Sequence, residues 1–313
     1  MENDPKQETK RILPDTIPIE VRKDQVVGSV EKTIKTKPQK KQRKSCCSGC
    51  GCIVLIMFLL LVLYFLLPFA NRFLLLGIDR APSGSMLGRS DTIMVFSVDP
   101  LLPTVKVLAI PRDLWVPIPQ YGENRINTAH FFAEAQQAGA GPDSALRTVN
   151  QNFGFNVRYY LRFNLENFPA AIDALGGVTI TLSQPMSGYP AGSYHLNGTQ
   201  ALAFVRSRSD GDDFFRIRQG QVFLVSFIRQ IFNPVSWPGL PQFLVTLPSA
   251  MDTNIPIWLW PRMGLAMLRT SFSGIEFLVI DRSMVTPFLT SEGARVLLPN
   301  WQEIDAYVAE NFR

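Results

Sequence analysis

Three short apolar runs between residues 73 and 110 constrain the fold of this chain more than any other feature. They are Phe73–Ile78, Thr92–Val98 and Val105–Ile110. Each run is rich in Leu, Ile, Val and Phe and is short enough to be a buried β-strand. Further along the chain, strand patterns alternate with helical ones. This order predicts an α/β fold in which a central mixed β-sheet is flanked by helices on both faces.

Charged residues stand at the ends of these predicted strands. A ligand crevice in an open α/β sheet lies at strand ends, where loops carry polar side chains beside glycines. A single Arg–Asp pair would most simply be a surface salt bridge of little energetic value. The same pairing at three strand ends favours a ligand site instead. The residues are Asp79, Arg80, Arg89, Asp91, Arg112 and Asp113, near Gly77, Gly84 and Gly88.

The charge of the chain is unevenly distributed. Residues 1–52 contain 12 Lys and Arg against seven Asp and Glu, whereas the remaining residues contain 19 of each sign. The main domain is therefore neutral in bulk, which argues against nucleic acid as its ligand. Of its 19 basic residues, 18 are Arg and the other is Lys106. Guanidinium groups bind phosphate and carboxylate in bidentate fashion, so this bias is typical of an anion-binding domain.

The N-terminal part predicts a membrane anchor. Residues 1–52 are polar and basic and are expected to be a disordered cytoplasmic tail. Residues 53–70 form an unbroken apolar stretch long enough to span a bilayer as one transmembrane helix. Because Lys35–Lys44 precede this stretch, residues 71–313 are expected on the extracytoplasmic side, and the basic segment is expected against anionic membrane lipids. The cluster Cys46–Cys52 is typical of a position beside a membrane, and its role stays open.

The rest of the chain predicts an ordered series of elements. Helices are expected from Asn127 or Thr128 to about 137 and from Asp143 or Ser144 to about 153. They are followed by a strand at 158–163, a helix at 166–175, a strand at 178–182 and a helix at 195–205 capped by Asn197. A long amphipathic helix at 214–232, short helices near 240–247 and 262–268, a strand at 275–280 and a helix from Trp301 complete the series.

A second charged cluster follows the predicted helix at 195–205. Four arginines within thirteen residues would repel one another unless an anion or the neighbouring aspartates balanced them. A purely structural salt-bridge network is the alternative. An anion site is favoured, because such charge clusters gather at functional sites. The residues are Arg206, Arg208, Asp210, Asp212, Asp213, Arg216 and Arg218.

These charged residues stand within a set of ordered motifs. The motifs are LLLGIDR, GRSDT, IPRDLWVPIP, RINTA, the Tyr159–Tyr160 pair, IDALGGV, HLNGTQALAFVRSR and DFFRIRQ. Their order and spacing resemble those of the LytR-CpsA-Psr family, from about Phe73 to the C-terminus and most densely up to about Phe232. Eight motifs in order are far more specific than any one of them.

The resemblance implies a membrane-anchored enzyme of the bacterial cell wall. Such enzymes transfer a glycopolymer, for instance a teichoic acid, from a polyprenyl-pyrophosphate lipid to peptidoglycan with the help of Mg²⁺ or Mn²⁺. By position, Asp79 and Asp91 match the acidic pair that handles the metal. Together with Arg112 they are the expected catalytic residues, although the sequence leaves open which aspartate acts as base. The expected pyrophosphate-binding residues are Arg89, Arg112, Arg206, Arg208, Arg216 and Arg218.

Several alternatives stay open. The chain could be a polyprenyl-pyrophosphate hydrolase, or a non-catalytic regulator that binds anionic wall lipids. The sequence departs from the usual family pattern after Arg216, so the roles of Arg218, Gln219 and Gln221 are uncertain. His130 and His195 are expected to be packing or capping residues. The aromatic segments at 131–132 and 223–228 are expected in the core, and some of them could line a tunnel for the polyprenyl chain.

Overall fold

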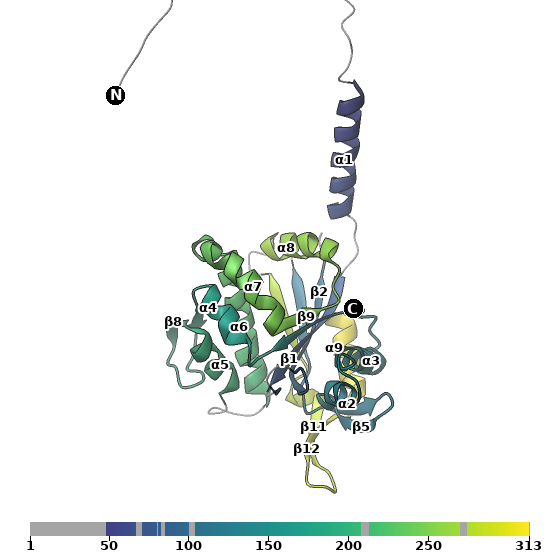
Figure 1. Cartoon of the computed structure of the whole chain (residues 1–313). Helices are drawn as coiled ribbons and strands as arrows, with labels where there is room; N and C mark the ends of the chain where they lie inside the picture. The colour runs from purple at the N-terminus through teal and green to yellow at the C-terminus, as the bar shows by residue number, and fades with distance from the viewer. Residues whose placement is uncertain are drawn as a thin grey trace, which may run out of the picture. The chain divides into compact units, whose positions relative to one another are not determined.

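The computed structural model describes residues 48–66, 71–79, 81–82, 85–99, 104–207, 213–269 and 274–312 (Figure 1). Of the expected disordered tail at residues 1–52, residues 1–47 lie outside this set, whereas residues 48–52 are helical. Residues 67–70 of the expected membrane span also lie outside it. Helix α1 (Ser48–Leu66) covers the apolar stretch up to that gap. Within the described residues, no helix combines the length and apolarity that crossing a membrane requires.

A six-stranded mixed sheet forms the centre of residues 53–313, with the strand order β10-β3-β2-β1-β6-β9. Central strand β1 is antiparallel to β2 and parallel to β6. The three expected apolar runs are therefore neighbouring strands, and the predicted mixed sheet is confirmed. The strands are β1 (Asn71–Asp79), β2 (Arg89–Val98), β3 (Val105–Ala109), β6 (Tyr159–Asn164), β9 (Met251–Thr253) and β10 (Ile275–Val279).

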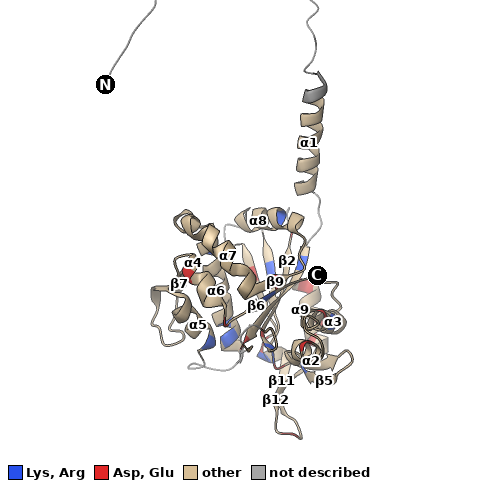
Figure 2. Cartoon of the chain, viewed as in Figure 1, with Lys and Arg blue, Asp and Glu red and all other residues tan. Residues whose placement is uncertain are grey.

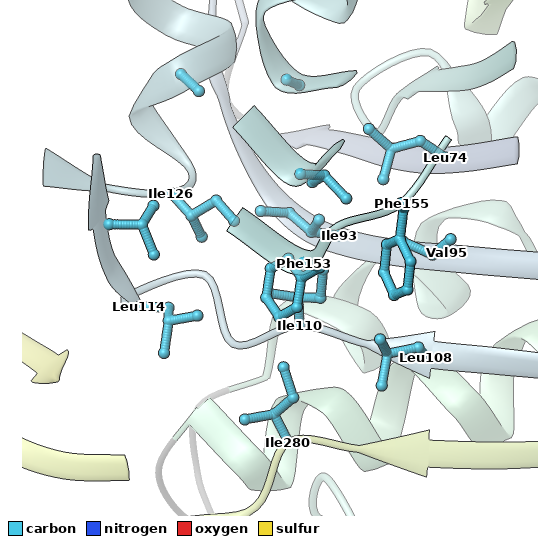
Figure 3. Close-up of a cluster of buried hydrophobic side chains, with 14 of the residues drawn as sticks. Leu74, Ile93, Val95, Leu108, Ile110, Leu114, Ile126, Phe153, Phe155 and Ile280 are labelled. Atoms are coloured by element: carbon cyan, nitrogen blue, oxygen red, sulfur yellow. The ribbon is translucent and has the colours of Figure 1, made fainter. Parts of the chain in front are cut away.

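Alternation along the strands directs side chains into two apolar layers, one on each face of the sheet. In β1, Leu74, Leu76 and Ile78 join the layer that holds α2 (Thr128–Gln136), α3 (Gly141–Phe153) and α9 (Trp301–Asn311). Figure 3 shows part of this layer. Phe73 and Leu75 join the opposite layer with residues of α6 (Asp213–Phe232) and α8 (Trp260–Arg269). Helices therefore pack on both faces of the sheet, as expected.

A third apolar cluster lies beside the sheet. It joins α6 to α4 (Phe168–Ala174), α5 (Gly198–Arg206), α7 (Leu240–Ala250) and the hairpin of β7 (Val178–Leu182) and β8 (Gly192–Leu196). Phe223 and Phe227 are buried in this cluster, where both rings lie against Phe168. These aromatic residues fill a core, so the tunnel hypothesis does not hold for them.

Three local expectations differ from the structure. The helix expected at 195–205 begins at Gly198 after an Asn197 capping box, and His195 lies in β8 instead. Asn127 precedes α2 but makes no side-chain capping bond, and α3 begins at Gly141, before Asp143 and Ser144. Short hairpins and 3₁₀ turns were not expected: β4 (Trp115–Ile118) with β5 (Gly122–Arg125), β11 (Val285–Leu289) with β12 (Arg295–Pro299), η1 (Pro234–Gly239), η2 (Ile257–Leu259) and η3 (Arg282–Met284).

A β-bulge interrupts the pairing of β1 with β2 near the carboxyl end of β1. Gly77 pairs with Thr92 but Ile78 pairs with Ser90, so Asp91 is the extra residue on β2. Regular alternation would put Asp91 on the same face as Ile93, against α2 and α3. A bulge breaks this alternation and re-aims the side chain. Asp79, by alternation from Phe73 and Leu75, is on the face that packs against α6.

We predict that Gly77→Ala destabilises the fold by about 1–3 kcal/mol, because a methyl group there overpacks the bulge. A Cβ at Gly77 would lie 2.9 Å from Cβ of Thr92. Gly264→Ala is the matched control, since a Cβ at Gly264 in α8 meets nothing within 4 Å. The measurement is the free energy of unfolding in denaturant. Equal stability of the two variants would contradict the close approach described here.

Candidate active site

One cleft at the carboxyl end of β1 gathers charged side chains from separate elements. It holds Asp79 of β1, Asp91 of β2, Arg112 after β3, Arg206 at the end of α5, and Arg216 of α6. Figure 2 shows basic residues on α5 and α6 at this end of the sheet. The remaining wall is mainly apolar and is formed by Thr92, Ile93, Met94, Ala109, Ile110, Leu165, Val205, Ile217 and Gly220. The cleft therefore offers both charged and apolar contacts to a ligand.

Asp79 and Arg206 form a close ion pair on one side of the cleft. Nε of Arg206 donates to Oδ1 of Asp79 at 2.7 Å, and Nη2 lies 2.5 Å from the same oxygen. Glu166, just beyond β6, accepts from Nη2 at 2.5 Å. Burial acts to lower the pKa of Arg206, but the bonds to Glu166 and Asp79 outweigh burial and raise it. The guanidinium is thus held in place before any ligand arrives.

On the other side of the cleft, the polar contacts are made to Asp91. Its Oδ2 lies 3.1 Å from Nη1 of Arg112 and 3.7 Å from Nη2 of Arg216, which brings two distant segments together. Its Oδ1 accepts from Nδ2 of Asn127 at 3.4 Å. The side chain of Asp91 is 15% exposed, so the group is screened from most of the solvent yet open to the cleft.

Asn127 forms hydrogen bonds with two segments on this side of the cleft. Its backbone carbonyl accepts bonds from both N and Oγ of Ser90, at 3.2 and 3.3 Å. Its backbone N donates to the carbonyl of Arg112 at 3.2 Å. Together with the bond to Asp91, these contacts fix the start of β2 against the segment that follows β3. Asn127 is itself 2% exposed and belongs to the RINTA motif.

The structure brings five of the expected site residues into one cleft and leaves two described ones, Arg89 and Arg218, apart from it. Arg89 pairs in register with Asp79 but is exposed and does not line the cleft. Arg218 is also exposed and does not line it. Arg208 lies outside the described residues, as do Arg80, Asp210 and Asp212 of the charged clusters.

Gln219, whose role the sequence left open, is fully buried and braces α5 against α6. Its Nε2 donates to the carbonyls of Phe204 and Ser207 at 3.3 and 3.4 Å, and also to the hydroxyl of Ser187. These carbonyls flank Arg206, so Gln219 supports the position of that guanidinium. Sequence reasoning missed Gln219, Glu166 and Asn127 as site-supporting residues. The RINTA motif was the one signal for Asn127.

A buried polar network lies behind β2. Nδ1 of His130 contacts the carbonyl of Gly88 at 2.9 Å, and Nη1 of Arg162 contacts Nε2 of His130 at 3.1 Å. Because a carbonyl only accepts and a guanidinium only donates, His130 must be neutral with its proton on Nδ1. Arg162 also pairs with Glu134 at 3.0 Å and with Asp252 at 2.6 Å. The network holds the backbone at Gly88, two residues before the bulged segment.

This environment shifts the pKa of two groups. Burial, helped by the charge of Arg162, lowers the pKa of His130 to about 4. Burial acts to raise the pKa of Glu134, but the backbone N–H groups of Gly139 and Gly141 and the charge of Arg162 outweigh it and lower that pKa. His130 was expected to be a packing residue, and its ring does fill a buried position.

A sequence profile of the LytR_cpsA_psr family matches residues 70–309, which is most of the chain. This chain belongs to the LytR-CpsA-Psr family.

Individual relatives match shorter stretches. The polyisoprenyl-teichoic acid–peptidoglycan teichoic acid transferase TagU of Oceanobacillus iheyensis is 40% identical over 160 residues, which cover 49% of this chain and 49% of TagU. Regulatory protein MsrR of Staphylococcus aureus is 32% identical over 191 residues, covering 58% of this chain and 56% of MsrR. The chain thus spans about half the length of the curated relatives it matches.

Solved structures share the fold of this LytR-CpsA-Psr member. TagV of Bacillus subtilis aligns with a TM-score of 0.60 at 23% identity, covering 77% of this chain and 96% of TagV. The structure described as TagT bound to LI-WTA aligns with a TM-score of 0.59 at 23% identity, and the alignment covers 77% of this chain and 88% of TagT. At this level of identity the similarity concerns the mixed α/β fold.

The donor set of the cleft suits the divalent metal that the LytR-CpsA-Psr resemblance implies. Mg²⁺ is usually held by one or two carboxylates together with substrate phosphates, and less often by a cage of protein ligands. Asp79 and Asp91 supply two carboxylates from adjacent strands in the same cleft. Within the described part of the chain, no group of three or more His, Cys, Asp and Glu could hold a metal ion alone.

We predict that acid destabilises this LytR-CpsA-Psr protein through His130. Between pH 6.5 and about 4, the unfolded chain binds a proton at His130 that the folded chain does not bind. The stability due to the neutral ring is complete above pH 6.5 and declines as the pH falls, by about 2 kcal/mol between pH 6.5 and 5.

Denaturant unfolding of the full chain in detergent at several pH values measures this effect. His130→Gln should make the free energy of unfolding less dependent on pH in this window, although the variant is less stable than the unchanged chain at pH 7. His195→Gln is the control, because His195 is exposed in β8. If the slope of His130→Gln equals that of the unchanged chain, another group is responsible for the acid sensitivity.

Proposed function

We propose that this protein transfers a glycopolymer from a polyprenyl-pyrophosphate lipid to peptidoglycan, as a phosphotransferase of the glycopolymer-1-phosphate type. The observation that carries the proposal is the convergence of Arg112, Arg206 and Arg216 on one cleft that also contains Asp79 and Asp91. Family membership and the name of the relative TagU support the choice of substrate and acceptor.

The two kinds of wall in the cleft suit an amphiphilic substrate. Arginines from three segments offer bidentate contacts to a diphosphate. Met94, Ala109 and Ile217 line the cleft on the sheet face that α6 covers, and they continue the apolar layer between the sheet and α8. Free inorganic diphosphate would gain nothing from this apolar wall, whereas a lipid-linked diphosphate would.

Transfer proceeds by displacement at one phosphorus. The hydroxyl oxygen of the acceptor sugar attacks the phosphorus that carries the glycopolymer, and a new P–O bond forms. The bond from that phosphorus to the bridging oxygen breaks, and polyprenyl phosphate leaves with the bridging oxygen and its electron pair. The hydroxyl proton passes to a carboxylate of the Asp79–Asp91 pair.

The arginines serve this reaction by positioning and charge stabilisation, which dominate phosphoryl transfer. Arg112 and Arg216, already aligned by Asp91, bind the phosphoryl oxygens on one side, and Arg206 binds them on the other. Arg208 is assigned to the pyrophosphate site by its motif position alone, whereas Arg89, which is exposed and does not line the cleft, is given no contact there. Mg²⁺ or Mn²⁺, held by Asp79 and Asp91 when bound, would neutralise pyrophosphate charge.

We also infer that residues 53–70 anchor the protein in the cell membrane. The apolar stretch follows the basic segment at 35–44, so the positive-inside rule leaves residues 1–52 in the cytoplasm and residues 71–313 outside. The proposed substrate resides in the membrane and its acceptor outside, which agrees with this topology.

Two alternative functions have support of their own. With water in place of the sugar hydroxyl, the same cleft would hydrolyse the lipid pyrophosphate. The relative named regulatory protein MsrR favours a second alternative, a non-catalytic regulator that binds anionic wall lipids.

We predict that Asp91→Ala and Arg112→Ala each lower transfer by about 100-fold or more, because each removes a preorganised charge from the cleft. The assay uses the full chain in detergent, Mg²⁺, a polyprenyl-pyrophosphate-linked glycopolymer and peptidoglycan. It measures release of polyprenyl phosphate. Arg218→Ala is the matched control, since this exposed arginine of the same cluster does not line the cleft. Near-normal turnover by Asp91→Ala or Arg112→Ala, in protein that unfolds at the usual temperature, would refute the site.

A second prediction separates transfer from hydrolysis and from regulation. With peptidoglycan present, the phosphorylated glycopolymer should become covalently attached to it in amounts equal to the polyprenyl phosphate released. Mass spectrometry of digested peptidoglycan measures the attachment. Release of free glycopolymer phosphate at the same rate with and without peptidoglycan would indicate the hydrolase. Binding of the lipid without any product, with or without metal, would indicate the regulator.

A further inference from the structure

An apolar surface remains exposed at the end of the sheet opposite to the cleft. Its members are Ile257 and Trp258 in η2, which are 77% and 65% exposed, and Leu265 and Leu268 in α8, which are 38% and 55% exposed. We call these four residues the η2–α8 surface. The two elements follow one another directly in the chain, and exposed apolar groups that gather in this way, unlike single scattered ones, mark an interaction site.

Helix α8 is apolar on its outer face as well as on the face that packs against the domain. Its residues Met263 and Ala266 pack into the apolar layer under the sheet, and Arg262 is also buried, at 4% exposure. Leu265 and Leu268, three residues apart, share the outer face. A helix on a protein that meets only water keeps its charge outside and its leucines inside. On α8, a described charged side chain is inside and leucines are outside.

The surrounding sequence is depleted of charge. Between residues 233 and 269 the charged residues are Asp252, Arg262 and Arg269. Asp252 is engaged by Arg162. The same stretch contains three of the five tryptophans, at 237, 258 and 260. Trp is enriched where protein meets the interface of a bilayer. This composition suits a lipid interface better than a protein partner, because protein interfaces are ringed by a polar rim.

The connectivity of the chain brings this surface to the membrane side. In register, Asn71 of β1 pairs with Val98, which pairs with Val105, which pairs with Ile275 of β10. The end of the sheet at which β1 begins is therefore also the end at which β10 begins, five residues after α8. In Figure 1, α8 crosses this end.

The proposed anchor ends beside the same edge. Asn71 directly follows the apolar stretch at residues 53–70, so β1 begins where the chain leaves the bilayer. From Leu66 to Asn71 the chain can extend at most about 18 Å. The edge that carries α8 is thus tethered close to lipid.

We propose that the η2–α8 surface lies in the interfacial layer of the phospholipid bilayer, as a second membrane contact of the extracytoplasmic domain. This inference rests on the proposed anchor but not on the proposed chemistry. An amphipathic helix of this kind lies in the plane of the interface with its apolar face among the acyl chains. The contact would fix the orientation of the domain, so that the cleft at the other end of the strands faces away from the bilayer.

Quenching of tryptophan fluorescence by brominated acyl chains tests the proposal. The full chain is reconstituted in nanodiscs made with brominated or ordinary phosphatidylglycerol and phosphatidylcholine. Brominated lipid should quench part of the emission, and Trp258→Phe should remove most of the quenched part. Trp115→Phe is the matched control, since Trp115 lies in β4 near the cleft end of the sheet. Quenching that is unchanged by Trp258→Phe, or absent altogether, would overturn the proposal.

A second variant pair tests the surface without changing a tryptophan. Leu265→Glu combined with Leu268→Glu should abolish the quenching of Trp258, because two carboxylates cannot enter the acyl region. Leu289→Glu, at an exposed apolar position of β11, should leave the quenching intact. All variants should unfold at similar temperatures, because these side chains are exposed.

Failure of the inference can be told from failure of the proposed function. Chain that transfers glycopolymer and stays in the nanodisc, but shows no quenching at Trp258, refutes the lipid contact alone. In that case a protein partner would be the remaining occupant of the surface. Chain that is quenched at Trp258 but has no transferase activity refutes the chemistry alone. Chain that does not enter nanodiscs refutes both the anchor and the lipid contact.

Discussion

The bulge opposite Gly77 is the constraint on which the rest of the site depends. Two aspartates on adjacent strands can share a cleft only if both side chains emerge on one face of the sheet. Asp79 reaches the α6 face by regular alternation, whereas Asp91 would point to the opposite face without the extra residue. The bulge turns Asp91 toward Arg216 of α6, and Gly77 makes room for it beside Thr92. Asn127 and the His130 network then hold the bulged strand from behind.

Around this pair, ion pairs hold the arginines before a ligand arrives. Arg206 is held by Asp79 and Glu166, and Arg112 by Asp91. Partly exposed pairs of this kind add little to stability, since solvent screens them. These pairs instead order the arginine side chains. The entropy lost in fixing each long side chain is lost on folding, so it is not lost again when a ligand binds. A diphosphate entering the cleft would therefore meet donors that are already aligned.

The sequence was sufficient to predict the central sheet but not the full set of residues that form and support the cleft. Alternation and apolar runs predict β1, β2 and β3, because burial of strands dominates there. The short hairpins, β8 among them, depend on tertiary contacts that no local pattern encodes. His195 was placed in the predicted helix although the Asn197 capping box, a local signal, starts that helix at Gly198. Arg216 and Arg218 were grouped by proximity in sequence, although residues two apart on a helix point about 200° apart. Helical geometry alone could have separated them. Gln219 could not have been assigned, since its partners lie on α5 and near β7.

The two ends of the sheet serve different surroundings. Asn71 and Asp79 are the first and last of the nine residues of β1, and the distance along the strand between them is about 26 Å. On the proposed anchoring, the chemistry then takes place well outside the bilayer, where a cross-linked wall polymer can reach it. A membrane-borne pyrophosphate must rise by the same distance, and its chain needs apolar surface along the way. The layer of Phe73, Leu75 and Met94 under α6 and α8 runs between the two ends, but its side chains are buried and packed, so in this structure it offers the polyprenyl chain no open surface. On the proposed function, the length of the strands therefore sets how far the reaction lies from the lipid that supplies its substrate.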